Sequence, residues 1–162
     1  MIRHYEEVQP MEPEGGDHFQ WVAALGAGLI PGVLLLLVPR GSPWAGISFF
    51  SSVIMGRPVP VGVMMPLPVL CLIHLLLAEL YGLVISMFVS HLTQGRAVLT
   101  GGVIGAGLYL INVAVVSWVL PSWRTNEVAV LFTHIVFGLI AGGAYRGLLR
   151  RRAVQHIENP SA

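Results

Sequence analysis

Four long runs of apolar residues dominate the chain, and shorter polar stretches separate them. They cover residues 21–38, 65–89, 97–120 and 127–149. Each run is long enough to cross a hydrocarbon layer of about 30 Å as a helix. Because a backbone in lipid must satisfy its own hydrogen bonds, we expect all four runs to be helical. The pattern therefore predicts an all-α, integral membrane four-helix bundle.

The first connection, residues 39–64, is long and rich in proline. Prolines flank an apolar stretch at residues 47–55 that is too short to span a membrane. We expect an interfacial or re-entrant segment here. The other two connections are short, so the last three helices should be antiparallel neighbours.

Charge is distributed unevenly between the two ends of the chain. Five of the eight acidic residues lie between Glu6 and Asp17, so residues 1–19 are expected to form a flexible acidic tail. Residues 20–149 form the predicted transmembrane domain, and residues 150–162 an arginine-rich tail. Helix ends rich in arginine favour the cytoplasmic side. The counts predict a multi-pass membrane protein with both termini in the cytoplasm.

The C-terminal arginines have two candidate roles. They can fix the topology, or they can contact anionic lipid headgroups at the membrane surface. The residues concerned are Arg146, Arg150, Arg151 and Arg152.

Composition supports the membrane interpretation and excludes several classes of protein. Hydrophobic residues make up 55% of the 162 residues and charged residues only 10%, whereas soluble domains carry roughly 25% charged residues. This excludes a nucleic-acid-binding protein and a disordered chain, and the single cysteine, Cys71, excludes a disulfide scaffold. The chain has no phosphate loop, HExxH or CxxC motif. We therefore expect a protein without enzymatic activity.

Small residues four positions apart recur in every apolar run. Such pairs let helix backbones approach closely in a membrane. The predicted packing residues are Gly28, Gly32, Ala78, Gly82, Gly101, Gly105, Gly138 and Gly142. On residues 65–89 they share one face with polar side chains, and leucines fill the opposite face, which should contact lipid.

Four polar residues lie on the inward faces and form the candidate interior cluster: His74, Glu79, Asn112 and His134. A rise of about 1.5 Å per residue places the two histidines and the asparagine at similar depths. Glu79 lies deeper and must be either protonated or paired, since a charge at the membrane centre is costly.

Three interpretations of this cluster stay open. The histidines can form interhelical hydrogen bonds to asparagine or to backbone carbonyls. The cluster can instead bind a quinone or a polar solute, or relay protons. Two histidines can also ligate haem or a metal ion. Because the glycines favour tight packing over an aromatic-lined slot, we expect no bound cofactor or metal.

The order of motifs in residues 65–152 resembles small bacterial inner-membrane proteins of the YagU type. The matching elements are the run from His74 to Tyr81, Arg96, the glycines from Gly101 to Gly105, Pro121-Ser-Trp123, and Glu127 followed by Phe132-Thr-His134 and the arginines. The first helix and the proline-rich connection depart from that pattern. The resemblance implies a bacterial inner membrane and brings no catalytic residues, since the family has no assigned activity.

Together these features predict a small accessory or structural subunit of a larger membrane complex. Its expected partners are the lipid bilayer and other membrane-protein subunits, not nucleic acid. A quinone-, solute- or proton-handling protein is the alternative, and a haem-binding electron-transfer subunit is a second one.

Overall fold

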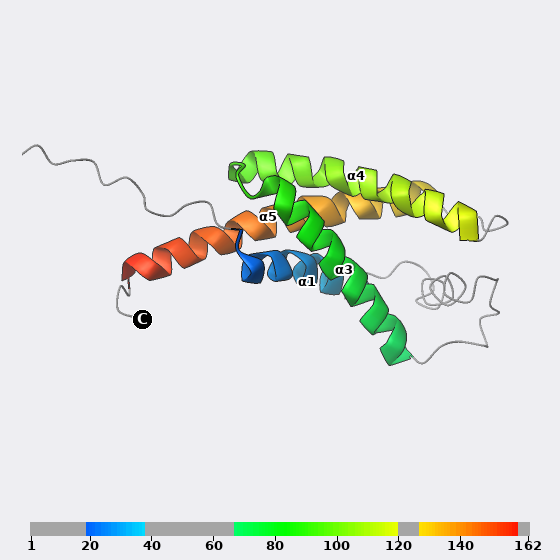
Figure 1. Cartoon of the computed structure of the whole chain (residues 1–162), viewed down its shortest axis with the longest axis horizontal. Helices are drawn as coiled ribbons and strands as arrows, with labels where there is room; N and C mark the ends of the chain where they lie inside the picture. The colour runs from blue at the N-terminus through cyan, green and yellow to red at the C-terminus, as the bar shows by residue number, and fades with distance from the viewer. Residues whose placement is uncertain (1–18, 38–66, 120–126, 159–162) are drawn as a thin grey trace, which may run out of the picture.

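The computed structural model describes residues 19–37, 67–119 and 127–158, and the regular secondary structure in these ranges is helical. The helices are α1 (Trp21–Leu37), α3 (Leu67–Val89), α4 (Gln94–Val119) and α5 (Glu127–Glu158). Successive helices run in opposite directions (Figure 1). The prediction of an all-α helical bundle is thus confirmed. The expected interfacial segment and nearly all of the acidic tail lie outside the described residues.

Three of the helices are long and apolar enough to cross a membrane. The candidate spans are Cys71–Val89, Gln94–Val119 and Val128–Arg152. The described part of helix α1 is also apolar and has 17 residues, or about 25 Å of helix. Pro31 lies within this continuous helix and is fully buried.

Helix α5 extends nine residues beyond its predicted end at Leu149, to Glu158. The residues that follow Leu149 include arginine, alanine and glutamine, which favour helix. Pro160 follows two residues after the helix ends, and a proline disfavours helix at the residue before it. The predicted arginine tail is therefore helical through most of its length.

Helices α4 and α5 form the most extensive contact in the fold, and glycine backbones meet there. A Cβ atom on Gly105 would collide with the carbonyl oxygen of His134, and one on Gly138 with the carbonyl oxygen of Gly101. The Cα of Gly142 lies 3.3 Å from the position a Gly101 Cβ would take. No larger residue fits at these points without moving the helices apart.

Helices α1 and α3 form a second pair of the same kind. The backbone of Gly28 occupies the place that a Cβ on Gly82 would need, and the Cβ of Ala78 lies 2.7 Å from the Cβ position of Gly32. The structure thus places all eight small residues of the predicted packing set at these two interfaces.

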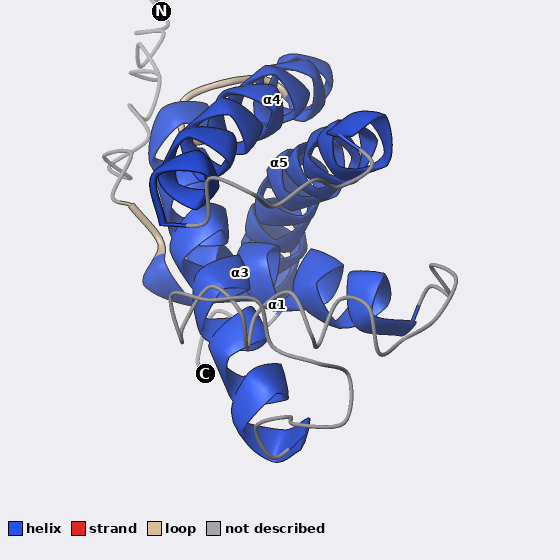
Figure 2. Cartoon of the chain, turned by 90° about the vertical axis from the view of Figure 1, so that its right-hand side faces the viewer, coloured by secondary structure: helices blue, strands red, loops and turns tan. Residues whose placement is uncertain are grey.

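Helix α3 does not pack mainly on α4, its neighbour in sequence. Its largest contact is with α1, while α1 and α4 both pack against α5. Figure 2 shows α4 and α5 side by side, with α3 leading away from them. Helices α3 and α4 are antiparallel, joined by a short turn and in contact through Tyr81 and Asn112, but each packs more extensively on another helix. The glycines of α4 pack against α5, and the face of α3 that carries Ala78 and Gly82 packs against α1.

Large apolar side chains cover the outside of every helix. On α3 the predicted lipid face is exposed, for example Leu72 (57%), Leu76 (60%) and Leu80 (53%). Residues such as Leu25, Val103 and Phe132 are exposed on the other helices. The core is small by comparison and is built largely from alanine and glycine.

The glycine contacts lead to a matched test. Gly105→Leu should lower the free energy of unfolding by about 2 kcal/mol or more, since overpacking costs about 1–3 kcal/mol. Gly107→Leu, two residues away, should change it by less than about 0.5 kcal/mol, because nothing lies within 4 Å of its Cβ position. Unfolding in mixed detergent micelles measures both. Equal losses in the two variants would contradict the assigned interface.

Candidate functional site

Three helices contribute to one hydrogen-bonded network in the interior. Tyr81 of α3 donates its hydroxyl proton to Oδ1 of Asn112 on α4. The Nδ2 of Asn112 lies 2.7 Å from Nε2 of His134 on α5. The Nδ1 of His134 lies 2.8 Å from the carbonyl oxygen of Val130, one turn earlier on α5. We refer to Tyr81, Asn112 and His134 as the polar network.

The network is consistent with a neutral histidine. A carbonyl oxygen only accepts, so Nδ1 of His134 carries the proton that it donates to Val130. Nε2 is then the acceptor for the Asn112 amide. Both ring nitrogens of His134 therefore already have partners inside the protein, and so do both ends of the Asn112 amide.

Aromatic rings pack against this histidine. The Tyr109 ring meets the His134 ring edge-on at 5.9 Å, and the Tyr81 ring lies 6.3 Å away. Phe137 packs edge-on against Tyr81 at 6.2 Å. Bulky rings fit here because the glycines that keep α4 and α5 in contact lie on the next turns of both helices.

His74 and Glu79 belong to the other interface, between α3 and α1. The Nε2 of His74 donates to the carbonyl oxygen of Gly32 at 3.1 Å. The carboxyl group of Glu79 lies over Gly28, where its Oε2 is 3.1 Å from the position that a Cβ on this glycine would take. This oxygen is buried, and no described residue gives it a hydrogen bond.

The predicted interior cluster is thus divided. The structure brings Asn112 and His134 together, and it places His74 and Glu79 at the contact with α1. The two kinds of histidine bond expected for a structural role, to asparagine and to a backbone carbonyl, are both present. Among the described residues, no group of three His, Cys, Asp or Glu side chains is placed to hold a metal ion.

Tyr81 is the member of the network that sequence reasoning missed. It follows His74 by seven residues, which is two helical turns, so both side chains start from nearly the same face of α3. From this spacing, the Tyr81 hydroxyl could have been predicted to face the interior. The helix–helix crossing, which turns His74 toward α1 and Tyr81 toward α4, could not be read from it.

A second set of bonds closes the opposite end of the bundle, at the turn between α3 and α4. Nη1 of Arg146 donates to the carbonyl oxygen of Ser90 at 2.8 Å. Nε2 of Gln94 donates to the carbonyl oxygen of Gly143 at 3.0 Å. Arg146 therefore contacts protein in addition to any role in topology, whereas Arg150 and Arg151 are exposed.

A scan against protein-family models found no match, and searches of curated proteins and of solved structures found none either.

The polar network can be tested with a double-mutant cycle. Tyr81→Phe and Asn112→Ala should be coupled by about 0.6 kcal/mol in unfolding free energy, the average for hydrogen bonds between membrane helices, and by at most about 1.7 kcal/mol. Tyr81→Phe and Gln94→Ala should be additive within about 0.5 kcal/mol, because Gln94 lies about 27 Å along α4 from Asn112. A coupling near zero in the first cycle would mean that this bond does not contribute to stability.

Proposed function

We propose that this chain is a non-catalytic, multi-pass membrane protein that acts as a small accessory or structural subunit of a larger membrane complex. The observation that carries the proposal is a contrast between inside and outside. The interior polar network forms its bonds within the protein, while apolar side chains face outward on all four helices.

The hydrogen bonds of the polar network support a structural role for it. A ligand that bound His134 through Nε2 would first have to displace the Asn112 amide. It would also leave the Asn112 amide nitrogen without this partner, which is costly in a partly buried site. The network is therefore better suited to holding α3, α4 and α5 together than to exchanging ligands.

The outward faces supply the surface for partners. Helices α1, α3 and α4 carry exposed apolar side chains that no other helix of the described fold covers. A bilayer accounts for part of this surface, and helices of other subunits can pack on the remainder. The small extramembrane mass expected from the sequence leaves helix faces as the main contact area.

Charge supports an orientation in the membrane. The described arginines gather at one end of the bundle: Arg96 starts α4 there, and α5 ends there with Arg146, Arg150, Arg151 and Arg152. Helix α1 begins at the same end (Figure 1). By the positive-inside rule this end is cytoplasmic, together with both termini. With the resemblance to YagU-type proteins, this favours the bacterial inner membrane.

One observation favours a second candidate function. Oε2 of Glu79 is buried at the α1–α3 contact without a hydrogen bond from a described residue, and ionisable groups inside membrane bundles often serve transport. A proton- or solute-handling protein is therefore the alternative, with a quinone as one candidate ligand. Haem binding is a weaker candidate, because the ring nitrogens of His134 are engaged.

The subunit proposal predicts a stable complex after gentle solubilisation. The tagged chain should migrate in native gels well above its monomer mass and carry a stoichiometric partner. Two pairs of tryptophan substitutions test which outward face binds the partner: Leu76→Trp with Leu80→Trp on α3, and Val103→Trp with Leu110→Trp on α4. The pair on the face that binds the partner should remove it. The pair on the other helix should retain it and serves as the control.

A chain that runs as a monomer in every mild detergent would contradict the subunit role. An absorption spectrum of the same preparation tests the haem alternative. Lipid extraction and mass spectrometry test for a quinone, and Glu79→Gln should then abolish its retention.

The orientation is tested separately with reporter fusions. A reporter after Ala162 should be active only as a cytoplasmic fusion, and one inserted within residues 41–60 only as an external fusion. A C-terminal reporter that is active outside the cytoplasmic membrane would reverse the orientation and would require another explanation for the arginines.

A further inference from the structure

Three exposed arginines follow one another near the end of α5. Arg150, Arg151 and Arg152 are all exposed, and Arg150 and Arg151 line a shallow open hollow with Val154 and Gln155. We refer to these three arginines as the arginine surface. Three adjacent cations on one helix repel each other, so an acidic or anionic partner would stabilise them.

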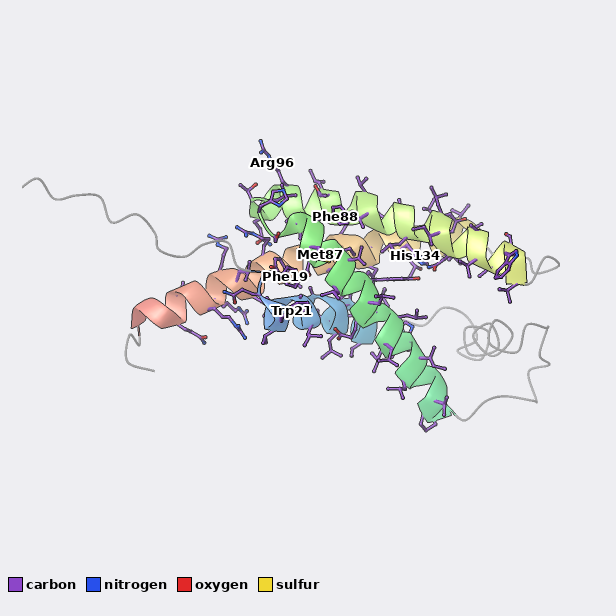
Figure 3. The ribbon with its side chains drawn as sticks, viewed as in Figure 1. Phe19, Trp21, Met87, Phe88, Arg96 and His134 are labelled. Atoms are coloured by element: carbon purple, nitrogen blue, oxygen red, sulfur yellow. The ribbon has the colours of Figure 1, made fainter. Side chains whose placement is uncertain are left out.

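The start of α1 is fixed beside this surface. Nη1 of Arg152 donates to Oε1 of Gln20 at 3.2 Å, and the backbone N–H of Gln20 donates to the hydroxyl of Tyr145 at 3.5 Å. The Phe19 ring stacks on the ring of Tyr145 at 6.1 Å. Figure 3 shows Phe19 at this end of the molecule. The first described residues of the chain, Phe19 and Gln20, therefore lie next to the arginine surface.

The residues that precede Phe19 in the sequence are the acidic ones. Five acids lie between Glu6 and Asp17, against three cations on the arginine surface. Asp17 is three residues from Gln20 and can reach at most about 11 Å from it, and Glu6 at most about 50 Å. A short tether of this kind gives an effective concentration on the order of millimolar. Single exposed ion pairs are weak, but several on one tether act together.

We propose that residues 6–17 bind the arginine surface of the same chain. The ligand is an acidic peptide segment, and α5 presents the cations at three consecutive positions of one helical turn. Bound there, the segment neutralises the arginines, so an anionic lipid headgroup or an acidic partner protein must displace it to reach them. The inference does not depend on the proposed partner subunit, since both groups belong to this chain.

The experiment measures the distance between the segment and the surface. Spin labels at Pro13→Cys and Gln155→Cys, in a Cys71→Ser background, report it in nanodiscs of phosphatidylcholine, a lipid without net charge. At 0.1 M NaCl we expect a narrow population of short distances. It should disappear at 1 M NaCl, where the screening length falls from about 10 Å to about 3 Å.

Charge reversal identifies the contact. Arg151→Glu should reduce the narrow population at least twofold, and adding Glu12→Arg and Glu14→Arg to it should restore the population. Arg96→Glu is the matched control, because this arginine is exposed at the same end but projects away from the bundle (Figure 3). It should leave the distances unchanged.

Two results would overturn the proposal. One is a broad distance distribution in phosphatidylcholine at low salt. The other is a narrow distribution that Arg151→Glu does not alter, which would leave the arginines free to face lipid headgroups. Because the labels report on a contact within one chain, either result leaves the question of a partner subunit untouched.

Discussion

The close approach of glycine backbones is the constraint on which the rest of the structure depends. Where α4 meets α5, carbonyl groups of one helix occupy the space that a side chain on the other would need. Lipid tails are as apolar as leucine, so burial of leucine gives little net attraction between helices in a bilayer. Dispersion contacts between closely packed backbones have to supply it instead. This explains why the core contains mostly small residues while leucine covers the outside.

The same constraint determines where polar chemistry can occur. On α5, Gly138 and Gly142 occupy the contact with α4, and His134 lies one turn earlier, where its own carbonyl still touches Gly105. Its side chain is therefore held at the edge of the glycine contact, within reach of Asn112. Tyr81 can join the pair because α3 crosses at this level. The Tyr109 ring packs against His134, and the Phe137 ring packs against Tyr81.

The helices and their packing faces could be predicted from the sequence, because both depend on local patterns. Apolar runs set the helices, and glycines four apart marked the faces that now carry Gly28 against Gly82 and Gly101 against Gly138. Pairing could not be predicted, since several faces have the same small-residue spacing and any two would fit. The assignment of His74 to α1 and of Tyr81 to α4 depends on that pairing. For the same reason, the bond from Arg146 to Ser90 was not foreseen.

The repeat that brings α4 and α5 together also leaves their alignment ambiguous. Small residues lie four positions apart on both helices, at Ala97, Gly101 and Gly105 on α4 and at Gly138 and Gly142 on α5. Sliding one helix by a turn, about 5.4 Å, would put small residues against small residues again. The bond between Asn112 and His134 has no such repeat, and a slide of one turn would separate its partners. A single buried polar pair is a known means of fixing the register of packed helices. In this fold the glycines bring the helices together, and the amide and the imidazole select one of the alignments that the glycines permit.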